Sequence, residues 1–309
     1  MKILVTGGAG FIGSHIVEHY HKAAEIIVMD DLRTGHRRNL SGFDVNIVEA
    51  SICDRLAVKS VMKNVDVVFH MAAMVSVPES VHFPIRCAET NVIGLLNVLE
   101  EAASAGVRKF CFCSSAAVYG NNPVVPKSED MLPEPRSPYA VTKLDGEYYC
   151  QQFLENRGLE TVALRFFNVF GPRQDPKGAY AAAVPIFFEH ALAGTPITIY
   201  GDGNQTRDFI FVKDVVGALS FMASTPGITG VHNTGYGTQI TVLELAKQII
   251  SLTNSKSQIQ FAPERLGDVR HSRACISRLC KAGFKPRGTL ELGLRQMLSA
   301  FQRPADAAQ

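Results

Sequence analysis

The 309-residue chain lacks tryptophan, a strong charge of either sign and any long hydrophobic run. Its 31 basic and 29 acidic residues leave a formal net charge of +2, too little to gather nucleic acid or anionic lipid. No apolar stretch approaches the ~20 residues of a membrane-spanning helix. These absences argue against nucleic-acid and membrane partners. With 46% hydrophobic residues, the chain can still bury a large core.

Metal sites are equally poorly indicated. The seven cysteines are irregularly spaced, and Cys111 and Cys113 share one face of an apolar strand, where packing explains both thiols. The nine histidines show no ligand spacing, so His70 and His271 are interpreted as structural or substrate-adjacent. The chain opens directly into a strand pattern, without a signal-type segment before it. We therefore expect structural cysteines, no metal and a reducing cytoplasm.

Strand and helix patterns alternate through the first half of the chain. Strands are expected at Lys2–Thr6, Glu25–Asp30, Asn46–Glu49, Val65–His70, Lys109–Ser114 and Thr161–Phe166. Helices are expected at Ser14–Lys22, Leu56–Lys63, Cys87–Ala105 and Tyr139–Asn156. Strands that are apolar on both faces require parallel pairing with helices on both sides. The pattern predicts an α/β fold with a doubly wound parallel (Rossmann) sheet.

The alternation loosens after Gly171. Loops rich in Gly, Pro and Asp at Arg173–Gly178 and Gly201–Thr206 separate shorter elements. This change predicts a Rossmann domain over residues 1–166 and a smaller α+β substrate-binding domain over residues 167–309. Residues 208–231 are the exception, because this stretch could instead return to the first domain.

A glycine cluster lies between the first strand and the first helix. Residues 6–13 read TGGAGFIG and contain both G-x-G-x-x-G and G-x-x-G-x-x-G. Glycines at Gly7, Gly10 and Gly13 permit a tight turn and close approach to a pyrophosphate, which the free N–H groups of the helix start would face. The alternative is a glycine turn without a ligand. The position between strand and helix favours a dinucleotide site.

Asp30 ends the second strand, 17 residues after Gly13. A carboxylate there can accept hydrogen bonds from the adenine ribose hydroxyls and repels a 2′-phosphate, which favours NAD. Arg33 could hold such a phosphate in NADP, but an arginine in this loop is more often solvated.

A tyrosine and a lysine, Tyr139 and Lys143, lie four residues apart on one helix face. A neighbouring ammonium and a positive nicotinamide ring both favour the phenolate, which would make Tyr139 a base. Alone, the pair is more often an amphipathic surface pair. The strand ending at Ser114 and Ser115 strengthens the catalytic interpretation, since its carboxyl end lies where such folds bind ligands. No histidine is placed to activate either serine, which disfavours covalent catalysis.

These motifs, with CSSAAVYG at residues 113–120 and RFFNVFGPR at residues 165–173, resemble the extended short-chain dehydrogenase/reductases that act on nucleotide sugars. Within that group the chain is most similar to the UDP-hexose 4-epimerases. The resemblance covers nearly the whole chain and implies a homodimer formed through the long helices at Cys87–Ala105 and Tyr139–Asn156. It implies Ser115, Tyr139 and Lys143 as catalytic residues.

The resemblance also implies two sets of binding residues. Those for a tightly held NAD are Gly7, Gly10, Phe11, Ile12, Gly13, Asp30, Ala72, Asn91, Tyr139, Lys143 and Phe166. Those for a UDP-sugar are Ser76, Ser115, Asn168, Val184, Thr198, Tyr200, Arg207, Arg265, Asp268 and Ser272. Taken singly, the two arginines would more often be solvated, and Tyr200 could equally be packed in the core.

Related dehydratases and decarboxylases carry acidic residues just after the catalytic hydroxyl, where this chain has Ala116 and Ala117. Without an acid there, hydride return to the opposite face is the simplest outcome. We therefore expect a 4-epimerase of UDP-hexoses. The small Ser272, in place of a tyrosine, suggests that UDP-N-acetylglucosamine and UDP-N-acetylgalactosamine are accepted besides UDP-glucose and UDP-galactose. The alternatives are a UDP-glucuronate epimerase or decarboxylase, a dehydratase, and a non-catalytic NAD-binding sensor.

Overall fold

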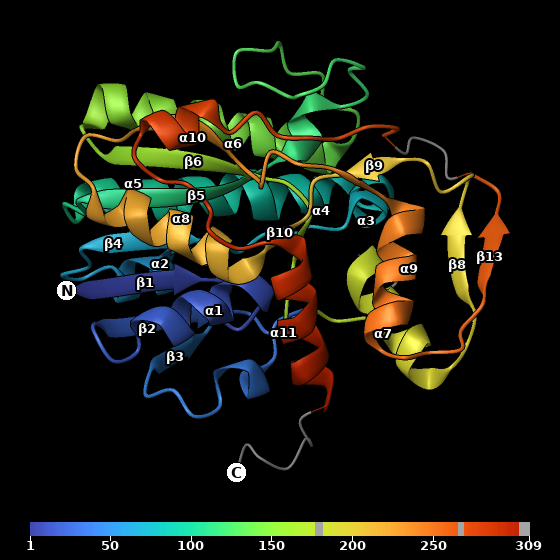
Figure 1. Cartoon of the computed structure of the whole chain (residues 1–309). Coiled ribbons are helices and arrows are strands. Elements are labelled where there is room, and N and C mark those ends of the chain that lie inside the picture. Colours follow the sequence, from blue (N-terminus) through green and yellow to red (C-terminus); the bar gives the residue numbers. More distant parts are fainter. Residues whose placement is uncertain (177–181, 265–268, 303–309) are drawn as a thin grey trace.

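The computed structural model describes residues 1–176, 182–264 and 269–302 (Figure 1). Within these residues the largest sheet has seven strands, all paired in parallel, in the order β11-β6-β5-β4-β1-β2-β3. The strands are β1 (Lys2–Thr6), β2 (Glu25–Asp30), β3 (Asn46–Glu49), β4 (Val67–His70), β5 (Lys109–Ser115), β6 (Glu160–Phe166) and β11 (Gly230–Thr234). The predicted doubly wound parallel sheet is confirmed.

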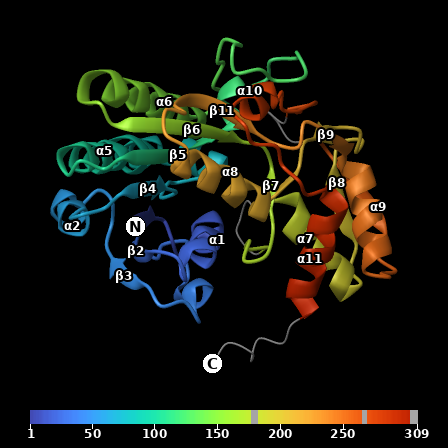
Figure 2. The ribbon, with the colours of Figure 1, turned by 60° about the vertical axis from the view of Figure 1, so that its left-hand side comes forward.

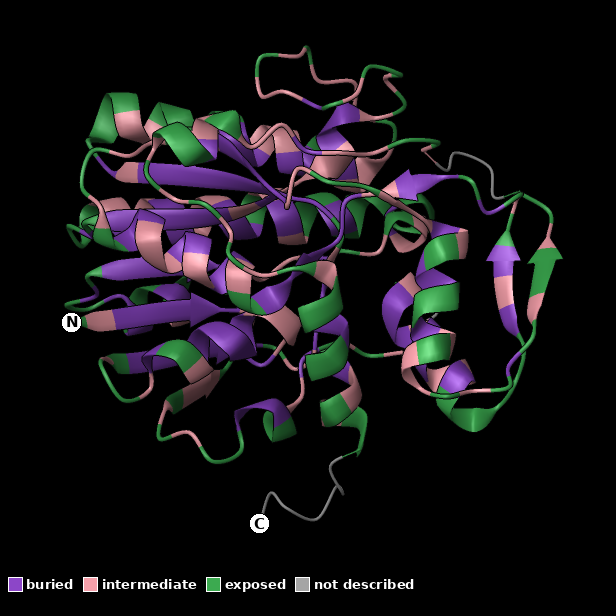
Figure 3. Cartoon of the chain, in the orientation of Figure 1, coloured by how far each residue is buried: buried purple, intermediate pink, exposed green. Residues whose placement is uncertain are grey.

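Helices cover both faces of this sheet (Figure 2). One face carries α2 (Arg55–Val61), α5 (Gly94–Ser104) and α6 (Pro138–Arg157), and the other carries α1 (Phe11–Tyr20) and α8 (Val212–Ser224). Because side chains alternate along a strand, Val67 and Phe69 of β4 pack in one core while Val68 packs in the other. Figure 3 shows the inner strands of the sheet buried almost throughout, whereas the edge strand β3 has no buried residue. Burial on both faces is the physical reason for their continuous apolar runs.

The expected helix Cys87–Ala105 is not a single regular helix. A π turn at Glu89–Ile93 joins α4 (Pro84–Ala88) to α5, and the short α3 (Val77–His82) precedes α4. The π turn places the amide of Asn91 against the backbone of Met74, with Nδ2 to O at 3.0 Å and N to Oδ1 at 2.7 Å. Such turns are often found near functional sites. The expected helix is present as far as Ser104, but the π turn within it was not predicted, because the long-range contact of Asn91 has no signature in hydrophobic periodicity.

The rest of the chain builds a second core beside the sheet. Its helices are α7 (Ala183–Ala193), α9 (Val242–Leu252) and α11 (Leu290–Gln302), with α10 (Ser277–Lys281) beside β11. Its strands form three pairs: β7 (Val169–Phe170) with β10 (Ile210–Phe211), β9 (Thr206–Arg207) with β12 (Ile240–Thr241), and β8 (Ile197–Tyr200) with β13 (Ile259–Ala262). No helix of the described segments is long and apolar enough to cross a membrane.

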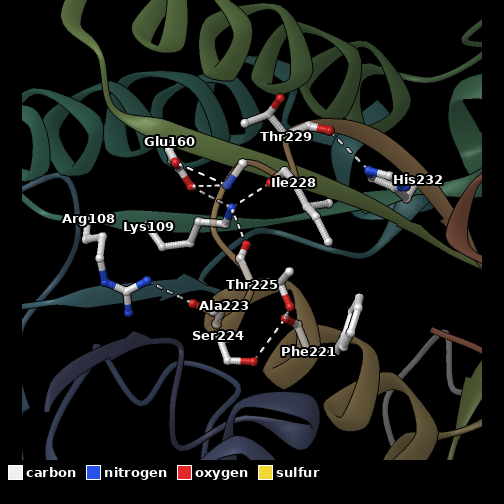
Figure 4. Close-up of polar contacts among 11 residues, drawn as sticks. Arg108, Lys109, Glu160, Phe221, Ala223, Ser224, Thr225, Ile228, Thr229 and His232 are labelled. Atoms are coloured by element: carbon white, nitrogen blue, oxygen red, sulfur yellow. Dashed lines mark hydrogen bonds and ion pairs between the residues drawn. The ribbon is translucent and has the colours of Figure 1, made fainter. Parts of the chain in front are cut away.

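A buried lysine of β5 holds the amino end of the edge strand β11 (Figure 4). Lys109, at the start of β5, has no exposed surface, and its Nζ contacts Glu160 Oε2 at 3.0 Å. The same ammonium donates to the carbonyls of Ile228 at 2.5 Å and Thr225 at 3.4 Å. Both carbonyls lie in the link between α8 and β11. Residues 212–234 therefore belong physically with the sheet, although they follow the first elements of the second core.

Candidate active site

The glycine-rich turn between β1 and α1 leaves no room for side chains. A Cβ at Gly7 would lie 2.6 Å from the amide nitrogen of Ala72, and one at Gly13 would lie 2.2 Å from the carbonyl oxygen of Gly7. Gly7 also has a φ of +67°, a conformation that suits glycine. Gly10 precedes α1 without a capping side chain, so Phe11, Ile12 and Gly13 begin the helix with backbone N–H groups unpaired within it. This geometry fits a diphosphate held by backbone donors.

Asp30 lies beside this turn at the carboxyl end of β2. Its Oδ2 accepts from the amide of Ala9 at 2.9 Å, and its Oδ1 accepts from the amide of Leu32 at 2.9 Å. Burial raises the pKa of Asp30, and these backbone donors oppose the rise. Arg33, the residue that could have favoured NADP, forms an ion pair with Glu79 at 3.0 Å. An acidic group next to a phosphate-binding turn fits an adenine ribose with free hydroxyls.

The three expected catalytic residues meet at the carboxyl end of β5. Ser115 ends this strand, and its side chain lies close enough to the Tyr139 phenol to lower the phenol's pKa. Tyr139 is in the first turn of α6, which Ser137 caps. One turn later, Lys143 Nζ donates to the carbonyl of Cys113 at 2.7 Å and lies 5.8 Å from the centre of the Tyr139 ring. The predicted trio is therefore brought together in space.

Burial is the largest influence on the pKa values of Tyr139 and Lys143. Burial raises the pKa of Tyr139 well above its usual range, and the nearby Ser115 side chain only partly opposes that rise. Burial also lowers the pKa of Lys143, whose ammonium binds a backbone carbonyl instead of the phenol. Among the protein groups alone, desolvation dominates the pKa of Tyr139, so the expected phenolate depends on the charge of the nicotinamide ring as well as on Lys143.

Other residues expected at the NAD site lie near the glycine-rich turn or near the catalytic trio. Ala72, just after β4, contacts Gly7, and Phe166 ends β6 opposite Ser115. Ser76, which was expected on the UDP-sugar side instead, caps α3, and its Oγ accepts from the amide of Glu79 at 3.2 Å. The side-chain amide of Asn91 is fully engaged by its contacts to Met74, Thr142 and Cys87. Asn91 therefore holds the backbone of the loop after β4 in place at Met74.

On the substrate side, three expected residues converge on one segment of chain. Asn168 Nδ2 donates to the carbonyl of Asp208 at 2.9 Å. Arg207, in β9, donates to the carbonyls of Thr206 at 2.9 Å and Arg270 at 3.5 Å, and it lines a cavity of about 290 Å³. The amide of Ser272 donates to the Thr206 carbonyl at 3.1 Å. Asn168, Arg207 and Ser272 are thus linked through residues 206–208.

The remaining expected substrate residues lie farther along the second core. Val184 is in the first turn of α7 with its side chain buried in that core. Thr198 and Tyr200 are on β8, at the outer end of the molecule in Figure 1, where Thr198 Oγ1 accepts from Gln260 Nε2 at 2.7 Å. Arg265 and Asp268 lie outside the described residues.

Comparison with known proteins identifies the family to which this site belongs. Residues 3–233 match the NAD dependent epimerase/dehydratase family. The chain belongs to this family. A UDP-glucose 4-epimerase of Mycolicibacterium smegmatis is 38% identical to the chain over 314 residues, which cover 98% of the chain and 99% of that protein.

Solved structures agree with this assignment. The UDP-N-acetylglucosamine 4-epimerase from Methanobrevibacter ruminantium M1, solved with UDP-N-acetylmuramic acid, has a TM-score of 0.94 at 39% identity and covers 97% of each chain. The UDP-glucose 4-epimerase of Thermus thermophilus, in complex with NAD, has a TM-score of 0.89 at 36% identity and covers 97% of this chain and 99% of that one. The family that the chain matches is described as NAD dependent, so NAD is the cofactor of this family member.

Sequence reasoning missed several residues that shape the epimerase/dehydratase site. The buried Ser80 accepts from the amide of Tyr139 at 3.2 Å and has no motif to reveal it. Glu147 pairs with Arg165 at 2.7 Å beneath the site and also binds Ser114. Its position one turn after Lys143, on the same helix face, was an available signal.

Asp208 is a further residue that the sequence did not single out. It is fully buried, and it accepts from the amides of Tyr236 and Gly237 at 2.9 Å and of Ala274 at 3.0 Å. Burial raises its pKa to about 6. Its contact with Ala274 anchors the segment that carries Ser272.

Proposed function

We propose that this protein is an NAD-dependent 4-epimerase of UDP-hexoses, an isomerase. Bound NAD would supply a reversible hydride acceptor, so that the hydride taken from the sugar could be returned to its opposite face. Ser115 and Tyr139 are the groups that handle the proton of the reacting hydroxyl, and Lys143 supports them through its charge. Asp30 and the turn at Gly7–Gly13 would hold the dinucleotide.

The meeting of Ser115, Tyr139 and Lys143 beside the glycine-rich turn carries the proposal. Such a trio serves proton transfer at a hydroxyl next to a hydride acceptor, and a non-catalytic sensor would have no need to keep it together. Because burial holds the pKa of Tyr139 high, the positive charge of the oxidised nicotinamide is needed to favour the phenolate. This couples proton removal to the oxidised state of the cofactor.

The residues after Ser115 favour epimerisation over elimination or decarboxylation. Ala116 and Ala117 open the short helix at Ala116–Tyr119, and the amide of Ala117 donates to Ser115 Oγ at 3.1 Å. Neither of these two positions carries a carboxylate that could take part in loss of water. The competing functions remain a UDP-glucuronate epimerase or decarboxylase on the same scaffold and a non-catalytic NAD-binding sensor.

We assign UDP-sugar binding mainly to residues 167–309, apart from α8 and β11, and NAD binding to residues 1–166. The contacts of Asn168, Arg207 and Ser272 with residues 206–208 support their assignment to the substrate. Arginine suits a diphosphate because its planar fork can donate two bonds. The small Ser272 leaves room for an acetamido group. We therefore include UDP-N-acetylglucosamine and UDP-N-acetylgalactosamine among the substrates.

The family resemblance also supports a homodimer in the cytoplasm. Exposed apolar side chains gather on elements that pack together between α3 and α6, namely Val81, Phe83, Ile85, Ile93, Val141 and Tyr148. Burying such side chains against a second copy would be favourable. All seven cysteines are free thiols, as a reducing compartment requires.

The deciding experiment incubates purified protein with each UDP-hexose and resolves the products. We expect 4-epimers to form without net production of NADH. Tyr139→Phe should lower turnover at least about a hundredfold with little change in UDP-sugar binding, because the phenol acts mainly on the proton in the transition state. Release of carbon dioxide from UDP-glucuronate would instead identify a decarboxylase. Near-normal turnover by Tyr139→Phe would remove this residue from the mechanism.

A further inference from the structure

An ion pair joins the two loops on either side of the glycine-rich turn. Strand β1 lies between β2 and β4, so the loops after β2 and β4 flank the turn that follows β1. Arg33, three residues after β2, contacts Glu79 of α3 with Nη1 to Oε1 at 3.0 Å. Only 27% and 29% of the two side chains are exposed. The contact therefore spans the adenosine end of the site, next to Asp30.

Both ends of this ion pair are anchored. At the Arg33 end, the amide of Leu32 donates to Asp30, and the amide of His36 donates to the carbonyl of Ala9 at 3.0 Å. This ties the loop to the glycine-rich turn itself. A contact between fixed supports loses little side-chain and loop entropy when it forms, so its attraction is available to oppose opening.

At the Glu79 end, the support is the catalytic helix. Ser76 caps α3, and the buried Ser80 in the same short helix accepts from the amide of Tyr139 at 3.2 Å. Glu79 therefore extends from an element that is braced against the start of α6. The ion pair thus connects helix α3, which contacts Tyr139, with the loop that follows Asp30.

We propose that Arg33 and Glu79 form a strap over the adenosine end of the NAD site that slows dissociation of the cofactor. Neither residue touches the reacting atoms, so both are positioning residues. An enzyme that regenerates its cofactor in each turnover benefits from holding it between turnovers. The inference rests on the proposed function only through the NAD cofactor.

The test measures NAD retention without any sugar substrate. Purified protein is dialysed, and the NAD remaining in denatured samples is quantified over time for wild type, Arg33→Gln, Glu79→Gln and the double variant. We expect each single variant to lose NAD about three- to tenfold faster, with no further acceleration in the double variant. The charge-exchanged double variant R33E/E79R should recover most of the retention. Raising the salt concentration should accelerate loss from wild type but not from the neutral double variant.

A matched control uses another arginine of the same segment. Arg37 pairs with Glu49 of β3, on its own side of the turn, so Arg37→Gln removes a similar charge without opening the strap. Its NAD loss should match wild type. Faster loss from Arg33→Gln with none from Glu79→Gln would mean that Arg33 binds the cofactor directly, which overturns the proposal. Equal retention in all variants would overturn it too. The retention assay does not depend on turnover. If the protein proved inactive on UDP-hexoses but still lost NAD faster without the strap, only the proposed function would be refuted.

Discussion

Replacing the buried Lys109 with methionine tests how the edge strand β11 is held in the sheet. Methionine keeps the length and apolar stem of the side chain, but it removes the ion pair with Glu160 and both hydrogen bonds to the link before β11. Glu160 keeps about a third of its side-chain surface in water and can be rehydrated. The carbonyls of Thr225 and Ile228 lose a charged donor.

The magnitude follows from these contacts. A hydrogen bond from a charged donor contributes about 1.5–3 kcal/mol, so the two carbonyl contacts amount to about 3–6 kcal/mol. Part of this loss is offset because the variant no longer has to desolvate an ammonium. We therefore expect Lys109→Met to lower the free energy of unfolding by about 2–4 kcal/mol. For a chain of this size, this corresponds to a fall in Tm of about 3–6 °C.

The assay compares thermal unfolding of Lys109→Met and Lys2→Met at saturating NAD. Lys2 pairs with Glu25 at 3.0 Å at the same end of the sheet, but two thirds of the Glu25 side chain is exposed, so this pair should contribute less than about 1 kcal/mol. Hydrogen exchange should also become faster at the β11 amides in Lys109→Met. Equal Tm shifts in the two variants, with unchanged exchange at β11, would refute the reasoning.

Two further predictions concern substrate choice and pH. Ser272→Tyr should abolish turnover of the acetamido substrates while sparing UDP-glucose and UDP-galactose, because the tyrosine ring excludes only the larger acetamido group. Equal loss of activity on both pairs of substrates would indicate general damage to the fold. No loss on either pair would place Ser272 outside the pocket. Burial lowers the pKa of His70 to about 3, so its stabilising contribution is complete above about pH 6.5 and is lost as the pH falls. His70→Gln should therefore flatten the decline of Tm between pH 7 and pH 5. Asp208, with its pKa raised to about 6, changes the stability in the opposite direction, but it does so equally in wild type and in the variant. Parallel Tm curves for the two proteins would contradict the role of His70.

The large sheet could be predicted because its strands carry a local signal. Apolar residues on both faces of β4 and β5, and glycines between β1 and α1, are visible in a short window of sequence. Helix α1 begins at Phe11, three residues before the expected start, because the glycine turn runs directly into it with Gly10 as its cap. Such boundaries depend on backbone geometry that periodicity does not record.

The candidate site could be predicted only in part, because much of it depends on contacts between distant residues. Ser115, Tyr139 and Lys143 stand in recognisable motifs. Ser80 binds the Tyr139 amide across 59 positions of sequence, and no local pattern marks it. The pKa of Tyr139 was also beyond sequence reasoning, since desolvation depends on everything packed around the phenol.

The parallel pairing of β11 with β6 has a consequence for how the chain is made. Strand β6 is complete at Phe166, but its partner ends at Thr234, after β7, α7 and α8 have been synthesised. Until then, a nascent chain with a folded amino-terminal part presents the unpaired backbone of β6, which is a template for pairing with other chains. The vulnerable period during synthesis therefore lasts for some seventy residues of elongation. A fragment that ends at Phe166 would keep the edge of β6 unpaired permanently and would be prone to aggregate. The two cores therefore cannot be separated by truncating the chain at this residue.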